Sequence, residues 1–140
     1  MYRHILVAIE HSDADRAIVE HVTQLAKLTG ARLLLLHVAD GFAARHYDDL
    51  QLRESEEMKT DRAYLDELTE RLAGQGLTVE SKLAMGDPAS EIIRTADEER
   101  VDLIAMSTHG HRFLNDMLRG TTVNRVRHLT KVPVLLLRAH

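Results

Sequence analysis

The sequence predicts an α/β fold, in which a single-domain, doubly wound, five-stranded parallel sheet carries helices on both faces. Five short apolar runs recur along the 140 residues, and longer amphipathic stretches separate them, as alternating strands and helices require. Hydrophobic residues make up 44% of the chain and charged residues 29%, which is typical of a globular protein. A chain of this length forms one domain with a substantial core, so we expect residues 1–140 to be one domain.

The first two strands are expected at 4–10 and 31–39. The first run, HILVAIE, is continuously apolar from Ile5 to Ile9, as a strand covered on both faces should be. The second run, ARLLLLHVA, has the same character. Both strands therefore belong in the middle of the sheet.

A helix is expected between these two strands. Ser12 is a good N-cap residue with an acidic residue, Asp15, three positions later, and Gly30 is a plausible stop. Apolar residues repeat between them at helical spacing, and this face consists of Ala14, Ile18, Val22, Leu25 and Ala26.

The middle of the chain predicts a long helix and a strand. Residues 40–47 are expected to form a loop or lid, and a charged helix follows from about 48 to 73. The segment LTVESKLA at 77–84 alternates in polarity, which predicts a strand that is less buried than the first two. The apolar face of the long helix consists of Met58, Leu65, Leu68 and Leu72.

The last third of the chain predicts two more helices and two more strands. GDP at 86–88 starts a helix, because proline is favoured in a first helical turn. The apolar run VDLIAMS at 101–107 is the fourth strand. Gly120 precedes a short helix that ends near Thr130, and VPVLLLR at 132–138 is the fifth strand.

The polarity of the strands predicts the sheet order 3-2-1-4-5. The first, second and fourth strands are the most apolar and should be central. Pro133 cannot donate a ladder hydrogen bond, which favours an edge for the fifth strand. This order reverses between the first and fourth strands, and ligands of such sheets bind beside that switch point, at the carboxyl ends of the strands. Those ends are residues 9–12 and 106–110.

A stretch rich in glycine and hydroxyl residues, MSTHGHRFLNDMLRGTT at 106–122, begins at this switch point. Gly110 allows a turn with positive φ or a close approach to a ligand. Gly120 is expected to open a helix whose unpaired N–H groups can meet an anion. The two ends of the stretch could therefore hold a polyphosphate between them.

At these residues the sequence resembles the universal stress protein family, specifically its nucleotide-binding branch. That branch carries a glycine, two residues, a second glycine, nine residues, and then glycine with serine or threonine; the corresponding residues here are Ser107, Gly110, Gly120 and Thr121. The resemblance spans the chain through ILVAIEHS, LLHV, GDPASEII and VPVLLLR. It implies a stress-response protein that binds ATP or AMP, and Mg²⁺ could accompany ATP.

The resemblance also implies which residues contact the nucleotide. Glu10 stands where the family usually has aspartate and should face the base or ribose. The sequence departs from the family pattern at Ser107, which replaces a glycine, at Phe113, where a small residue is common, and at Asp116, where a basic residue is common. The implied nucleotide-binding residues are Ala8, Ile9, Glu10, Ser12, Val38, Met106, Ser107, Thr108, His109, Gly110, Gly120, Thr121 and Thr122.

Composition excludes several classes of function. The formal net charge of −4 gives no sign of a surface that binds nucleic acid or anionic membranes. The chain has no cysteine, so it has no disulfide, thiolate nucleophile or cysteine-ligated metal. Its apolar runs are too short to span a bilayer, and no signal-peptide pattern is present. We therefore expect a cytoplasmic protein.

The leading interpretation is a regulatory nucleotide-binding module that forms a homodimer through the apolar strand Val132–Arg138, because an uncovered edge of this kind tends to associate.

Two alternatives stay open: a slow ATPase in the same crevice, although the sequence has no Walker lysine, and an interaction protein that binds no nucleotide. His109 and His111 could be read as a metal pair, but spacing suggests no third ligand. His37 is interpreted as a hydrogen-bonded core histidine.

Overall fold

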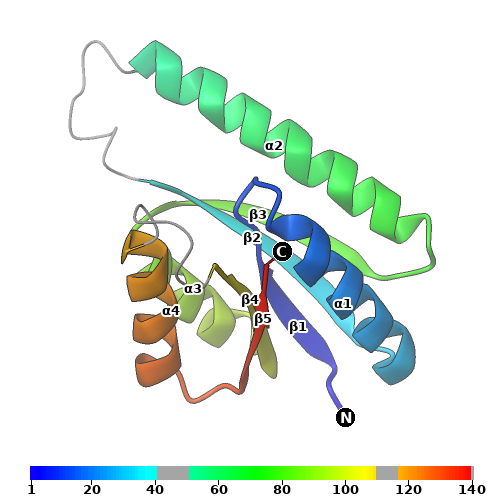
Figure 1. Ribbon diagram of the computed structural model, residues 1–140. Helices are drawn as coiled ribbons and strands as arrows, with labels where there is room; N and C mark the ends of the chain where they lie inside the picture. Colours follow the sequence, from blue (N-terminus) through cyan, green and yellow to red (C-terminus); the bar gives the residue numbers. More distant parts are fainter. Residues whose placement is uncertain (41–50, 110–116, 140) are drawn as a thin grey trace.

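The computed structural model describes residues 1–40, 51–109 and 117–139 and contains a five-stranded parallel sheet of order β3-β2-β1-β4-β5 (Figure 1). The predicted fold class and strand order are confirmed. The strands are β1 (His4–Ala8), β2 (Arg32–Asp40), β3 (Val79–Gly86), β4 (Leu103–Thr108) and β5 (Val134–Arg138). The helices are α1 (Asp15–Thr29), α2 (Gln51–Ala73), α3 (Pro88–Glu98) and α4 (Met117–Leu129).

The sheet lies between two pairs of helices, with α1 and α2 on one face and α3 and α4 on the other (Figure 1). Side chains of the central strand β1 alternate between the two cores: Val7 packs with α1 and α2, and Leu6 packs with α3 and α4. Both are fully buried. In contrast, β3 and β5 lie at the edges, as their polarity and Pro133 predict, and most of their residues are only partly buried. Within the described ranges, no helix combines the length and apolar character needed to cross a membrane.

The start of α1 differs from the prediction. The helix begins at Asp15, and its N-cap position is occupied by Ala14, so the expected N-cap role of Ser12 is wrong. The Ser12 hydroxyl instead accepts the N–H of Ala14 at 3.2 Å. The physical reason is the carboxylate of Asp15, which binds back to the residues before the helix and holds them in a turn. The end of α1 agrees with the prediction, because Gly30 is the C-cap with a φ of 75°.

Helix α2 has the expected apolar stripe along its second half only. Leu65, Leu68 and Leu72 are buried against the sheet. Met58 was expected to continue this stripe, but it lines a cavity and belongs to neither core cluster. The residues of α2 that line this cavity, 56–58, 60 and 61, lie in the first half of the helix. The second half therefore anchors the helix, and the first half is available to form a wall.

Helix α4 also starts earlier than the sequence predicts. It begins at Met117, so Gly120 lies inside the helix and does not open it. Two residues with high helix propensity, Leu118 and Arg119, precede this glycine, and a single glycine in a helix costs only about 1 kcal/mol. The N–H groups without a helical partner belong to the first four residues of a helix. The expectation that the N–H groups of Thr121 and Thr122 are free to bind an anion at the start of this helix is therefore wrong.

Helix α3 starts as predicted at Pro88, and its N-cap is Asp87. The Asp87 carboxylate accepts the Ser90 N–H at 3.0 Å and the Ser90 hydroxyl at 2.6 Å, and Arg125 donates to it at 2.8 Å. These hydrogen bonds from Ser90, followed by the interaction with Arg125, lower the pKa of Asp87. Arg125 thus links α4 to the start of α3.

Replacing Asp87 with alanine should lower the free energy of unfolding by about 1 kcal/mol at pH 7, the usual effect of losing an N-cap. Folding lowers the pKa of Asp87, so its contribution to stability is complete at pH values above about 3.9, the ordinary pKa of an aspartate. The contribution is lost as the pH falls below that value. Urea denaturation at pH 7 and at low pH measures both effects. Asp97→Ala, at an exposed position of α3, is the control and should change stability by less than about 0.5 kcal/mol. An equal effect of the two substitutions at pH 7 would contradict the capping role.

Candidate functional site

A cavity of about 850 Å³ opens at the carboxyl ends of β1, β2 and β4. One wall is the first half of α2, and the opposite wall is formed by the start of α3 and by α4. This is the switch point of the sheet, where the strand order predicts a ligand site. Residues from the predicted set that line the cavity are Ala8, Ile9, Glu10, Val38, Met106, Ser107 and Thr122.

Four other predicted site residues that the structure describes do not line the cavity: Ser12, Thr108, His109 and Thr121. Gly120 lies in the first turn of α4. Gly110 falls outside the described residues, as do His111, Phe113 and Asp116, so the expected role of that loop stays a prediction.

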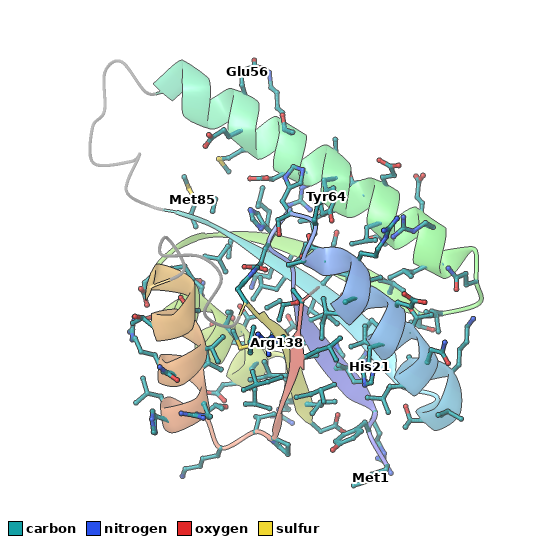
Figure 2. The ribbon with its side chains drawn as sticks, in the orientation of Figure 1. Met1, His21, Glu56, Tyr64, Met85 and Arg138 are labelled. Atoms are coloured by element: carbon teal, nitrogen blue, oxygen red, sulfur yellow. The ribbon has the colours of Figure 1, made fainter. Side chains whose placement is uncertain are left out.

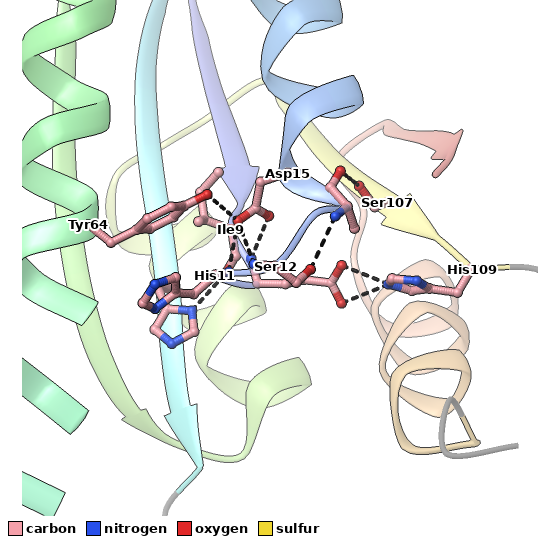
Figure 3. A network of polar contacts seen from close by, with 10 residues as sticks. Ile9, His11, Ser12, Asp15, Tyr64, Ser107 and His109 are labelled. Carbon is pink, nitrogen blue, oxygen red and sulfur yellow. Dashed lines mark hydrogen bonds and ion pairs between the residues drawn. The ribbon is translucent and has the colours of Figure 1, made fainter. Parts of the chain in front are cut away.

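Glu10 and His109 form a close pair across the switch point, and dashed lines mark the contacts of His109 in Figure 3. The His109 Nε2 lies 2.9 Å from Oε1 and 2.7 Å from Oε2 of Glu10, so an N–H at this nitrogen can donate to both oxygens. Both side chains are largely shielded, with 10% of His109 and 19% of Glu10 exposed. Glu10 follows β1 and His109 follows β4, so the pair ties together the two strand ends that flank the switch point.

The turn between β1 and α1 is built around the buried carboxylate of Asp15 (Figure 3). It accepts the N–H groups of Glu10 at 2.8 Å, His11 at 2.8 Å and Ser12 at 3.2 Å. The Tyr64 hydroxyl donates to the same carboxylate at 2.7 Å. Burial, and next this hydrogen bond to a carboxylate, raise the pKa of Tyr64. A cluster of convergent N–H groups is a common anion site, and here the anion is a side chain of the protein itself.

His11 occupies a backbone conformation that is rare for a residue with a side chain. Its φ is 65°, which costs about 1–2 kcal/mol outside glycine. Two contacts compensate: the His11 N–H donates to Asp15, and its ring stacks on Tyr64 with a centroid distance of 4.1 Å. Figure 2 shows Tyr64 on the side of α2 that faces the sheet. Strained residues of this kind gather at functional sites, and His11 lines the cavity.

Helix α2 contributes a second acidic group, Asp61, to the cavity wall. Its Oδ1 lies 2.6 Å from Nδ1 of His11, and its Oδ2 lies 3.3 Å from Nε2 of His37. The other ring nitrogen of His37 is 2.7 Å from the carbonyl oxygen of Ile9. The predicted hydrogen-bonded role of His37 is therefore confirmed, although its ring stands at the cavity and not deep in the core.

The charged groups that the structure describes around the cavity are mainly acidic. Glu10, Glu56, Glu57 and Asp61 line it, and within the described lining no lysine or arginine balances them. In the described ranges, no group of three histidine or acidic residues has a geometry that could hold a metal ion. Residues 41–50 and 110–116 lie outside this description.

The model of the universal stress protein family matches residues 1–138 of the chain. The chain belongs to this family. The resemblance found in the sequence motifs is thereby confirmed over almost the whole length.

Individual universal stress proteins support this assignment. YxiE of Bacillus subtilis is 31% identical over 150 aligned positions, which cover 99% of this chain and all of YxiE. The solved structure of MJ0577, from Methanocaldococcus jannaschii, superposes with a TM-score of 0.83 at 25% identity and covers 100% of this chain and 98% of that one. A universal stress protein solved in complex with cAMP superposes with a TM-score of 0.71 at 22% identity, covering 98% of this chain and 97% of that one.

The sequence departs from the universal stress protein pattern at Ser107, Phe113 and Asp116, and of these the structure describes Ser107. It lies within β4 and outside the set of residues with positive φ, as expected for a serine that can replace glycine without backbone strain. Its hydroxyl donates to the carbonyl oxygen of Ala14 at 3.3 Å, and only 8% of the residue is exposed. The serine therefore links β4 to the start of α1 while it borders the cavity.

Several cavity residues of this universal stress protein were missed by sequence reasoning. The largest group comes from α2, of which the sequence predicted only the apolar face. The signal that could have indicated them is a histidine inside an apolar strand, because a buried imidazole needs polar partners. The missed lining residues are His11, Leu36, His37, Ala39, Glu56, Glu57, Met58, Thr60, Asp61, Pro88, Ile92 and Val123.

Proposed function

We propose that the chain is a cytoplasmic regulatory protein of the stress response that binds an adenine nucleotide, ATP or AMP, in this cavity. The observation that carries the proposal is the cavity at the switch point of the doubly wound sheet. It is bordered by residues that the family pattern independently assigns to a nucleotide. The family member solved with cAMP lends further support.

The chemistry of the lining suggests how the nucleotide is oriented. Ala8, Ile9, Val38 and Met106 offer an apolar surface suited to a purine base. The N–H groups of the β1–α1 turn are already bound to Asp15, so this turn is not available for phosphate. The phosphates, with Mg²⁺ in the case of ATP, are therefore proposed to lie toward the β4–α4 side, where Thr122 lines the cavity.

Mass spectrometry of small molecules released by denaturing the purified protein tests this function directly. We expect ATP or AMP, and titration calorimetry of the emptied protein should then give saturable binding of the same nucleotide. A protein that releases no nucleotide and binds neither ATP nor AMP at millimolar concentration would instead be a nucleotide-independent interaction protein. Product formation in proportion to the protein concentration, abolished by Glu10→Gln, would identify a slow ATPase.

We further propose that two copies pair through Val132–Arg138. Within it, β5 is an edge strand whose residues Val134–Leu137 are only partly buried. The N–H of Ala139 donates to the carbonyl oxygen of Thr108. Because N–H groups alternate in direction along a strand, that of Leu136 faces outward, available to a second copy.

Light scattering at micromolar concentration should therefore give twice the monomer mass of 15.8 kDa. Leu136→Pro removes the outward N–H without removing a hydrogen bond to β4, and we expect it to give monomers. An unchanged far-UV circular dichroism spectrum is the control for folding. A wild-type mass near 15.8 kDa, independent of concentration, would contradict the dimer.

A further inference from the structure

His11, in the turn after β1, presents an imidazole ring to the cavity. Its Nδ1 is hydrogen-bonded to Oδ1 of Asp61, on α2, at 2.6 Å. An ionised carboxylate only accepts hydrogen bonds, so the proton of this bond belongs to Nδ1. The second ring nitrogen of a neutral imidazole is an acceptor. In the neutral ring, the lone pair therefore lies on Nε2.

This Nε2 atom of His11 is accessible to a ligand. It has no hydrogen-bond partner within the described residues. The buried polar atoms that lack a partner in this part of the chain are Nε2 of His4 and Oγ1 of Thr95, and the His11 ring is not among them. The His11 side chain is 30% exposed. Because the ring lines the cavity, its acceptor can meet a donor group of a molecule that is bound there.

Three contacts fix the orientation of the His11 ring. The hydrogen bond to Asp61 holds one edge, and Tyr64 stacks on the ring with a centroid distance of 4.1 Å and an interplanar angle of 21°. The backbone N–H of His11 donates to the buried Asp15 at 2.8 Å. A group whose orientation is set before the ligand arrives loses little freedom on binding. A hydrogen bond to Nε2 can therefore contribute to selectivity.

Other acceptors stand on the same wall, but nothing fixes them in the same way. Glu56 and Glu57 line the cavity, and both residues are exposed. The carboxylate of Asp61 is bonded to His11 through one oxygen, and its second oxygen lies 3.3 Å from Nε2 of His37. His11 thus presents an acceptor that is both fixed and accessible.

The orientation proposed for the nucleotide determines which of its groups faces His11. The phosphates are proposed to lie toward α4, near Thr122, with the base on the apolar surface of the strand ends. The glycosidic bond joins the base to the phosphate side. The far edge of a purine, which carries the substituent at position 6, is then turned toward the opposite wall. That wall is the first half of α2, to which His11 is bound through Asp61.

On the basis of the proposed function, we propose that His11 selects purines that carry an amino group at position 6. Adenine has an N–H donor at this position, whereas guanine and hypoxanthine have a carbonyl oxygen, which is an acceptor. Nε2 accepts a hydrogen bond from the amino group and faces the carbonyl oxygen with a lone pair. His11 is then a specificity-determining residue, and Asp61 is the positioning residue that keeps the proton on Nδ1.

Titration calorimetry with AMP and IMP, which carry an amino group and a carbonyl oxygen at position 6, tests the selection. The titrations are made at pH 8.5, above the range in which histidine usually changes charge. The wild type should bind AMP at least about tenfold more tightly than IMP, which corresponds to about 1.4 kcal/mol. His11→Phe keeps a flat ring for Tyr64 but removes the acceptor, and the two affinities should then agree within about threefold.

His128→Phe is the matched control, because it makes the same change at an exposed position in the last turn of α4. It should keep the preference of the wild type for AMP. Far-UV circular dichroism checks the fold of both variants. A folded His11→Phe protein with an undiminished preference for AMP overturns the selection by His11.

Nitrogen-15 NMR of the histidine rings tests the acceptor in the wild type itself. At pH 8.5 the His11 ring should carry its proton on Nδ1 alone, and AMP should shift the Nε2 resonance more than IMP does. In Asp61→Ala both neutral tautomers of His11 should be populated, and the preference for AMP should fall as it does in His11→Phe. A wild-type ring protonated on Nε2, or on both nitrogens, overturns the inference even if His11→Phe fails to fold.

The outcomes separate this selection from the proposed function. Equal affinities of the wild type for AMP and IMP overturn the role of His11, while the nucleotide site itself stands. Binding of neither nucleotide means that the proposed function fails, and the selection fails with it. The tautomer of the His11 ring, which is measured without nucleotide, still shows in that case whether Nε2 is an acceptor.

Discussion

Asp15→Ala is expected to lower the free energy of unfolding by about 3–5 kcal/mol, because it leaves several partly buried donors without an acceptor, and a buried donor without one costs about 1–3 kcal/mol. The donors are the N–H groups of Glu10, His11 and Ser12 and the hydroxyl of Tyr64. The loss also removes the bond that compensates for the left-handed backbone of His11. Urea denaturation followed by circular dichroism measures the change.

The control for this substitution is Asp13→Ala, in the same turn but with an exposed side chain, which should cost less than about 0.5 kcal/mol. Tyr64→Phe removes one of the donors and should fall between the two, at about 1–2 kcal/mol. If Asp15→Ala proves as mild as Asp13→Ala, the carboxylate does not organise the turn, and the assignment of the β1–α1 loop to Asp15 is wrong.

Ala8→Phe is expected to weaken the binding of ATP or AMP at least a hundredfold, which corresponds to about 2.7 kcal/mol. Ala8 ends β1 and borders the cavity, so a phenyl ring there takes up the space proposed for the base. Because the new side chain enters open space, the fold should persist. Titration calorimetry measures the affinity, and thermal unfolding checks the fold.

Ala63→Phe provides the matched control, since Ala63 is exposed on α2 and away from the lining. Its affinity for the nucleotide should equal that of the wild type. Undiminished binding by a folded Ala8→Phe protein would mean that the nucleotide occupies another part of the molecule, and the orientation proposed for the base would be wrong.

The arrangement of the sheet could be predicted from the sequence because it depends on contrasts that extend over whole segments. The continuous apolar runs of β1, β2 and β4 differ from the alternating β3, which predicts that β3 lies at an edge. Pro133 predicts the other edge for β5, although this strand is also apolar. Boundaries depend on single residues. Ser12 has the chemistry of an N-cap, yet the carboxylate of Asp15 determines where α1 starts. Gly120 resembles a helix boundary, yet the propensity of the residues before it extends α4.

The candidate site likewise has a part that could be predicted from the sequence and a part that could not. Residues on the strand ends, such as Ala8, Met106 and Ser107, were predicted from the family resemblance, and the switch point of the sheet independently predicted that residues 106–110 border a site. The α2 wall was not, because the side chains of Glu57 and Asp61 look the same in sequence as those of any solvated helix. Only tertiary structure brings Asp61 to His37, and a single sequence carries no record of that contact.

The distribution of the cavity residues along the chain has a consequence for folding. They begin at Ala8 and end at Val123, and the central strand β1 pairs with β2 and with β4, which is made much later. A nascent chain that has not yet released α4 from the ribosome therefore lacks part of the cavity. If the proposed nucleotide occupies this cavity, it stabilises the finished domain alone, by about 2.7 kcal/mol at a hundred times its dissociation constant. Under that proposal, the cellular supply of nucleotide would help to determine how long the mature protein survives.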